Sequence, residues 1–144
     1  MSRAFTMIEL IFVIVVLGIL AGVAIPKLAA TRDDATLAAM RANLATIMTA
    51  VQTQHGADLI AGNSAWKTLN FATTDKDAST HYNLSSLLSK PMKINADCSK
   101  TRNGFCEGKD NEVIIVVGGK RTMVRFNATN GTFDCGTDAA GVCK

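Results

Sequence analysis

The chain begins with a short basic segment followed by an uninterrupted apolar run, and this run constrains the fold more than any other feature. From Leu10 to Ile25 no residue is polar. A helix of about 20 apolar residues crosses a hydrocarbon core about 30 Å thick, and the segment from Phe5 to Ile25 reaches that length. The sequence therefore predicts a transmembrane helix near the amino terminus.

Glu9 is the one charged residue between Phe5 and Ile25. A carboxylate near the middle of a bilayer costs on the order of 2.5–3.5 kcal/mol, and less nearer the interface. Among packed helices it must be neutralised or paired, and an amine at the same depth is a suitable partner. Two plainer interpretations are an interfacial acid on an ordinary signal anchor and a secretory signal cleaved near residues 28–30.

The residues around Glu9 resemble a known processing signal. The sequence RAFTMIEL at 3–10, followed by the apolar run, is similar to the class III signal of type IV pilins and type II secretion pseudopilins. In that family a basic leader is removed before a phenylalanine, the new amine is methylated, and a glutamate at the fifth mature position serves assembly. The resemblance implies cleavage between Ala4 and Phe5, N-methylation of Phe5 and an assembly role for Glu9. Ala4 replaces the glycine of most members and is small enough that we expect processing.

The resemblance also implies a function and a set of partners. We expect a structural pilin subunit that prepilin peptidase processes and methylates, and that polymerises with its own kind and with other pilins into a type IV pilus. Before assembly it would lie in the bacterial inner membrane with its head in the periplasm, and afterwards in a pilus or pseudopilus filament. The alternatives are a pseudopilin of a type II secretion or DNA-uptake (competence) system and a monomeric, membrane-anchored binding domain.

Gly18, Gly22 and Pro26 interrupt the apolar run at four-residue intervals. Pro26 has no backbone N–H, so the carbonyl of Gly22 loses its helical bond, and each glycine weakens a helix by about 1 kcal/mol relative to alanine. One interpretation is a segment that bends or melts, as the helix of the resembling family does in filaments. The other is a surface of small residues for close helix packing in the membrane.

The whole chain has the size and composition of one small domain. With 144 residues, 48% of them hydrophobic and 19% charged, it is neither a multidomain enzyme nor a disordered chain.

Apolar residues at three- and four-residue steps predict an amphipathic helix that stops at His55-Gly56. Its apolar face consists of Leu37, Met40, Leu44, Ile47, Met48 and Val51. We therefore expect a leader (1–4), a transmembrane and assembly helix (5–26), an amphipathic helix (27–54) and a globular head (55–144).

The fold class expected for this chain is α+β. Residues 55–95 form a connecting region anchored by Trp66, Leu69 and Phe71, with a short helix near 83–89. Strand signals come later, at 112–117, at 121–126 after a Gly118-Gly119 turn, and at 132–135. These elements predict a long amino-terminal helix packed on a small antiparallel sheet, the layout of a pilin. Leu44, Ile47 and Val51 would be buried against Val124 and Phe126, and Arg121, Met123 and Arg125 would face outward.

Four cysteines, Cys98, Cys106, Cys135 and Cys143, allow three disulfide connectivities. Two local loops, Cys98 with Cys106 and Cys135 with Cys143, are the simplest, and the crossed pairing of Cys98 with Cys143 and Cys106 with Cys135 is the alternative. The resemblance favours Cys135 with Cys143, because pilins often close a carboxy-terminal loop. Zinc prefers cysteine pairs two to four residues apart, and seven residues separate these. Disulfides also suit a head outside the cytosol.

No arrangement typical of catalysis is visible, so we expect neither an enzyme nor a cofactor nor a metal site. His55 and His81 have no apparent nucleophile partner. Asp110, Asn111 and Glu112 offer oxygen ligands for calcium, but no EF-hand spacing is present.

Basic residues are frequent in the last third of the chain, although the net charge is only +3. They would attract DNA phosphates if they shared a face, whereas a solvated surface is the ordinary interpretation. These residues are Lys100, Arg102, Lys109, Lys120, Arg121 and Arg125.

Overall fold

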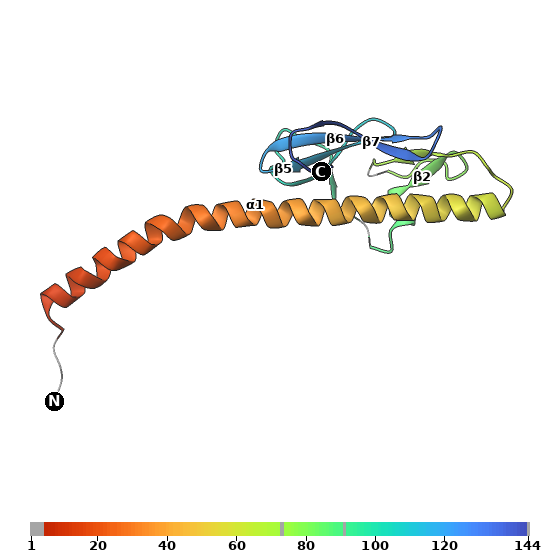
Figure 1. The fold of residues 1–144 in the computed structure, drawn as a ribbon. Helices are drawn as coiled ribbons and strands as arrows, with labels where there is room; N and C mark the ends of the chain where they lie inside the picture. The colour runs from red at the N-terminus through yellow and green to blue at the C-terminus, as the bar shows by residue number, and fades with distance from the viewer. Residues whose placement is uncertain (1–4, 73, 91, 144) are drawn as a thin grey trace. The chain divides into compact units, whose positions relative to one another are not determined.

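The structure is a computed structural model that describes residues 5–72, 74–90 and 92–143, apart from the side chains of residues 25–30. The chain divides into two compact units, Met1–Ala35 and Thr36–Lys144. Helix α1 (Met7–Ile60) contributes residues to both units, and every strand belongs to the second. The class is α+β, as expected from the sequence (Figure 1).

Helix α1 ends later than the sequence predicted, at Ile60 instead of near Gln54. Gly56 does not end the helix; a glycine weakens a helix but does not break its hydrogen bonds. The stop lies at Gly62, whose φ of 89° is left-handed. Its N–H donates to the Leu59 carbonyl (3.1 Å), and the Asn63 N–H donates to the Asp58 carbonyl (2.8 Å). This is a Schellman motif, and it satisfies the last carbonyls of the helix.

The head contains a five-stranded sheet in the order β3-β4-β5-β6-β7. Its strands are β3 (Ile94–Asn95), β4 (Gly104–Glu107), β5 (Glu112–Val117), β6 (Lys120–Asn127) and β7 (Thr132–Asp138). The strands from β4 to β7 pair antiparallel, and β3 pairs parallel with β4. β5 and β6 have the predicted bounds to within one residue, and Gly118 and Gly119 form the turn with φ of 58° and 80°. Strand β7 is longer than predicted because a register shift near Thr122 and Val124 lets it continue pairing.

Residues 61–95 are more regular than the sequence predicted. Strands β1 (Thr68–Asn70) and β2 (His81–Asn83) form a two-stranded parallel sheet. The short helix α2 (Leu84–Leu87) lies where a helix was expected. Strands this short have too few residues for a period-two pattern, so propensity alone does not reveal them.

One hydrophobic core joins the sheet to the second part of α1. Leu44, Ile47 and Val51 of α1 are in the same cluster as Val124 and Phe126 of β6, as predicted. The core also includes the expected anchors Leu69 (0% exposed) and Phe71 (2%), with Trp66 packed against it. The remaining buried apolar members are Tyr82, Leu84, Phe105, Val113, Ile115, Val117 and Val142. Arg121, Met123 and Arg125 of β6 are exposed, as expected for the opposite face of the strand.

Candidate functional site

The apolar start of α1 is the first candidate, and all its described side chains are exposed. From Phe5 to Ala24 no residue is buried within the chain. Met7–Ala24 is long and apolar enough to cross a membrane. Large apolar side chains such as Phe12 (68% exposed) and Ile19 (66%) contact nothing that would remove them from water. This segment therefore needs lipid or another protein surface to cover it.

Glu9 lies in the first turn of this helix, next to its first residues. The Thr6 carbonyl accepts hydrogen bonds from the backbone N–H groups of Glu9 (3.2 Å) and Leu10 (3.3 Å), which places Thr6 at the N-cap. Thr6 and Glu9 thus have the spacing of a capping box, and a negative charge there is favourable to the helix dipole. This spacing was not among the sequence predictions, although the pattern Thr-x-x-Glu is visible in the sequence.

Two of the three predicted interruptions, Gly18 and Gly22, lie on an open surface of the helix. A side chain at Gly18 or Gly22 would meet no atom within 4 Å, so both glycines present bare backbone to the surroundings. Pro26 lies within the bounds of α1, but its side chain is outside the described residues. Ala4, the residue before the expected cleavage, is also outside them. Gly18 and Gly22 are therefore compatible with both interpretations drawn from the sequence, helix packing and helix melting.

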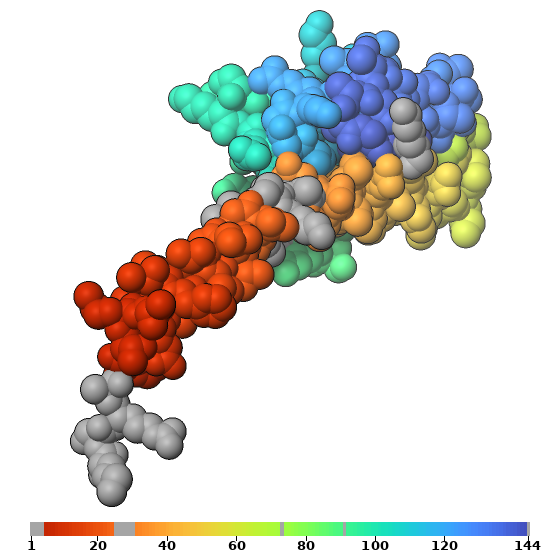
Figure 2. Space-filling model, turned by 60° about the vertical axis from the view of Figure 1, so that its left-hand side comes forward, coloured from red at the N-terminus to blue at the C-terminus, as the bar shows by residue number. Residues whose placement is uncertain are grey.

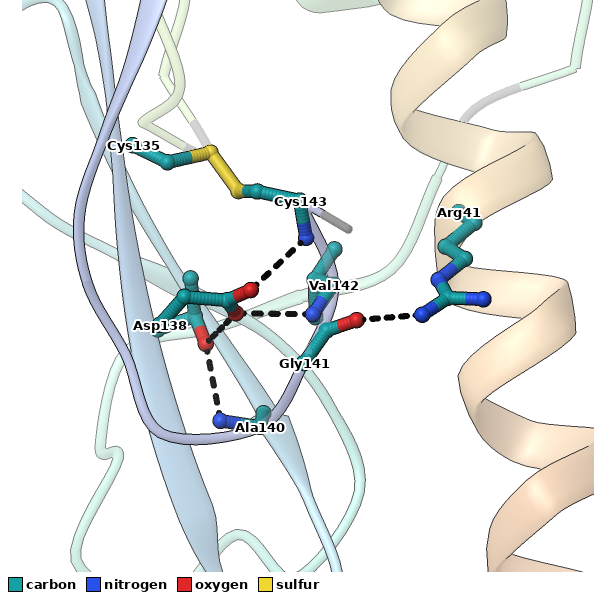
Figure 3. The surroundings of a disulfide bond; sticks show 8 residues. Arg41, Cys135, Asp138, Ala140, Gly141, Val142 and Cys143 are labelled. Carbon is teal, nitrogen blue, oxygen red and sulfur yellow. Dashed lines mark hydrogen bonds between the residues drawn. A yellow bond between two sulfur atoms is a disulfide. The ribbon is translucent and has the colours of Figure 1, made fainter.

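The carboxy-terminal loop is closed by the disulfide between Cys135 and Cys143, one of the two expected (Figure 3). The Cα atoms are 6.4 Å apart, within the ordinary range for such a bond. The guanidinium of Arg41 on α1 donates a hydrogen bond to the carbonyl of Gly141 (2.6 Å). The loop is therefore fixed at one side by a covalent bond and at the other by the helix.

Asp138 organises the inside of this loop (Figure 3). Its carboxylate accepts hydrogen bonds from the Val142 N–H (2.7 Å), the Cys143 N–H (3.2 Å) and the Thr122 hydroxyl (2.9 Å). Burial acts to raise the pKa of Asp138, but bonds from the Thr122 hydroxyl and from three backbone N–H groups outweigh it and lower the pKa. The carboxylate is thus the hydrogen-bond centre around which the loop turns.

The other expected disulfide, Cys98 with Cys106, is absent, and both residues are free thiols. Cys106 lies on β4 and is fully buried, whereas Cys98 lies in the preceding loop and is half-buried. Burial raises the pKa of Cys98 to about 11, and a hydrogen bond with Cys106 acts in the same direction. The crossed pairing is excluded as well, because Cys135 and Cys143 are bonded to each other. Sequence spacing is the same for the two pairs, so it does not distinguish them.

The residues considered for calcium are used within the protein. Asn111, with φ of 68°, exchanges hydrogen bonds with Leu69: its side-chain oxygen accepts from the Leu69 N–H (2.6 Å), and its own N–H donates to the Leu69 carbonyl (2.9 Å). Asp110 pairs with Lys76, and Glu112 pairs with Arg125. Within the described part of the chain, no three His, Cys, Asp or Glu side chains are grouped to hold a metal ion.

A buried polar cluster at the end of α1 was not predicted. His55 stacks on Trp66 with ring centroids 3.5 Å apart, and its Nδ1 lies 3.2 Å from the hydroxyl of Tyr82. Asp58 forms an ion pair with Lys67 (3.1 Å). Burial raises the pKa of Tyr82, and the charge of Asp58 acts in the same direction. The cluster fastens the last turns of the helix to β2 and to the segment before β1.

Comparison with protein-family models, with curated proteins and with solved structures gives no match for this chain. The inference of function therefore rests on the residues and the geometry described above.

Proposed function

We propose that the chain is a structural pilin subunit. Prepilin peptidase would cut it between Ala4 and Phe5 and methylate Phe5, and the subunit would polymerise through its apolar helix into a type IV pilus. The observation that carries this proposal is a wholly exposed apolar helix whose only acid, Glu9, lies in its first turn. Cleavage before Phe5 would put the new amine close to that carboxylate.

An exposed apolar helix has two environments in this proposal. In the inner membrane, lipid would cover the side chains from Phe5 to Ala24, with the head in the periplasm. In the filament, the helices of neighbouring subunits would cover them, and the bare backbone at Gly18 and Gly22 would permit close approach. The disulfide between Cys135 and Cys143 supports a head that matures outside the cytosol.

Glu9 would then act twice, as part of the helix cap and as the charge that pairs with the amine of a neighbouring subunit. The two roles separate by substitution, because glutamine also serves at the third position of a capping box. Glu9→Gln keeps the cap and removes the charge, and Glu9→Ala removes both. We expect both variants to reach the membrane and neither to form filaments, measured by electron microscopy and by subunit recovered after shearing. Asp34→Asn, which removes an exposed acid beyond the apolar run, is the matched control and should assemble normally.

Processing is tested separately by the amino-terminal sequence and intact mass of the membrane-extracted protein. The proposal expects a chain that begins at N-methylated Phe5. A chain that begins at Met1, or that is cut near residue 30, would contradict it and would leave a membrane-anchored or secreted domain.

The same helix supports a pseudopilin of a type II secretion or DNA-uptake system as the second candidate. Both candidates polymerise, so the Glu9 variants do not distinguish them. Loss of surface filaments on deletion of the gene would favour the pilus. Loss of secretion or transformation by cells that never display filaments would favour the pseudopilus.

A further inference from the structure

The loop before β4 and the turn between β5 and β6 form one rigid tip of the head. The Gly119 N–H donates to the Arg102 carbonyl (3.0 Å), and the Gly118 N–H donates to the Asn103 side chain (2.7 Å). The guanidinium of Arg121 donates to the Cys98 carbonyl (3.1 Å). Figure 2 shows the loop in turquoise beside the light-blue turn. Residues 97–103 and 118–121 are therefore held together, and we call them the basic tip.

The net charge of the chain is concentrated at this tip. Four basic side chains lie there, all exposed, against one acid. They are Lys100, Arg102, Lys120 and Arg121, and the acid is Asp97, 3.8 Å from Lys100. The chain has 15 basic and 12 acidic residues, so 11 of each remain elsewhere and cancel. The tip thus accounts for the whole formal charge of +3.

Several basic residues of the head outside the tip form ion pairs with acids. Arg125 pairs with Glu112, and Lys67 pairs with Asp58. Among the described residues, Arg102 and Lys120 have no acidic partner within ion-pair distance, although both belong to a hydrogen-bonded frame. The basic residues that the sequence grouped together are therefore sorted by the fold, with four at one tip.

The composition of the tip selects among anionic partners. Residues 97–103 and 118–121 include no aromatic and no large aliphatic side chain. They offer nothing on which an unstacked base would lie, and nothing that would enter the apolar part of a membrane. Guanidinium and ammonium groups suit phosphate oxygens, and a duplex presents about one negative charge per 1.7 Å of its axis.

From this geometry we propose that the basic tip binds the phosphate backbone of double-stranded nucleic acid, without preference for sequence. The contact uses side chains of the head alone, so it does not depend on whether the chain polymerises. Binding of this kind is driven by counterion release, and the logarithm of affinity falls with the logarithm of salt concentration by about 0.9 for each phosphate neutralised.

The test is a titration of a fluorescent DNA duplex with the full chain in neutral detergent micelles, followed by anisotropy at several salt concentrations. The slope expected for up to four contacts is about −3 to −4. Arg102→Gln together with Lys120→Gln should reduce the size of the slope by about 2 and weaken binding at low salt more than tenfold. Arg121 and Lys100 are kept, because one holds the loop and the other has an acidic neighbour.

The matched control is Lys90→Gln together with Lys93→Gln, two exposed lysines outside the tip with the same change of net charge. It should bind the duplex like the wild type. Equal weakening by both double variants, or no binding by the wild type, would overturn the proposal. Binding of heparin that depends on the tip, without binding of the duplex, would also overturn it and assign the surface to an acidic polysaccharide. None of these outcomes bears on filament assembly, which the Glu9 variants test.

Discussion

The segment from Phe5 to Ala24 and the head differ in the exposure of their apolar side chains. Between Phe5 and Ala24 every side chain is exposed. In the head, Ile47, Val51 and Ile115 are each 0% exposed and belong to one core. The two regions therefore differ in burial, because only the head covers its apolar side chains with other parts of the chain.

This difference indicates the source of stability of each region. The head is stabilised by burial within the chain, at about 25 cal/mol for each Å² of apolar surface removed from water. The apolar helix has no such burial and depends on lipid or on another protein surface to cover it. Substitutions in the head should thus change its stability, whereas substitutions in the apolar helix should not. Trp66, the only tryptophan, reports on the head by its fluorescence.

The largest difference should come from isoleucine truncation. Ile47→Ala leaves a cavity in the core of the head and should lower its free energy of unfolding by about 2–5 kcal/mol. Ile14→Ala, at a position 56% exposed, should leave that free energy unchanged. Both are measured by denaturant unfolding in micelles through Trp66 fluorescence. A comparable loss in both variants would remove the distinction between the two regions.

The next largest effect should come from the disulfide. On the chain-entropy model, closing the loop from Cys135 to Cys143 stabilises the head by about 2.5 kcal/mol, and Cys143→Ser should lose this. Cys98→Ser also replaces a cysteine by serine, but it opens no loop, and it should cost less than 1 kcal/mol because Cys98 is only half-buried. Alkylation of the unfolded, unreduced protein should label two cysteines, and labelling of none would show that Cys98 and Cys106 are also bonded.

A smaller effect is expected at Asn111, which links the loop before β5 to β1. Asn111→Gly keeps the left-handed backbone but removes the acceptor for the Leu69 N–H, and should cost about 1–3 kcal/mol. Asn111→Asp retains an acceptor oxygen and should cost less. If the aspartate variant were the less stable of the two, the hydrogen bond would not be the reason for asparagine here.

The smallest effect is a dependence on pH at Asp138. Its pKa is lower in the folded state, so its contribution to stability is complete above the ordinary pKa of an aspartate, about 3.9, and is lost as the pH falls through the folded value. Asp138→Asn should therefore lose less stability than the wild type between neutral pH and pH values below about 4. Parallel stability profiles for the two proteins would contradict the role given to this carboxylate.

The elements of the fold that the sequence predicted are those with a local signature. The β-branched run at 112–117, the two-glycine turn and the alternation on β6 each specify their own structure. The end of α1 and the short strands β1, β2, β3 and β4 were not predicted, because they depend on partners distant in sequence. Gly56 and Gly62 are both glycines, and only the hydrogen bonds of Gly62 and Asn63 decide which one ends the helix.

By itself the sequence determined the apolar helix, its acid at Glu9 and the resemblance to a pilin signal, because each depends on residues close together in the chain. It also determined which residues of β6 face the core. Only the tertiary structure decided which cysteines are bonded and which basic residues share a surface. Identical spacing of the two cysteine pairs does not show which pair is bonded. Likewise, Arg102 and Arg121 become neighbours only when the pairing of β4 with β5 and of β5 with β6 folds the chain back on itself.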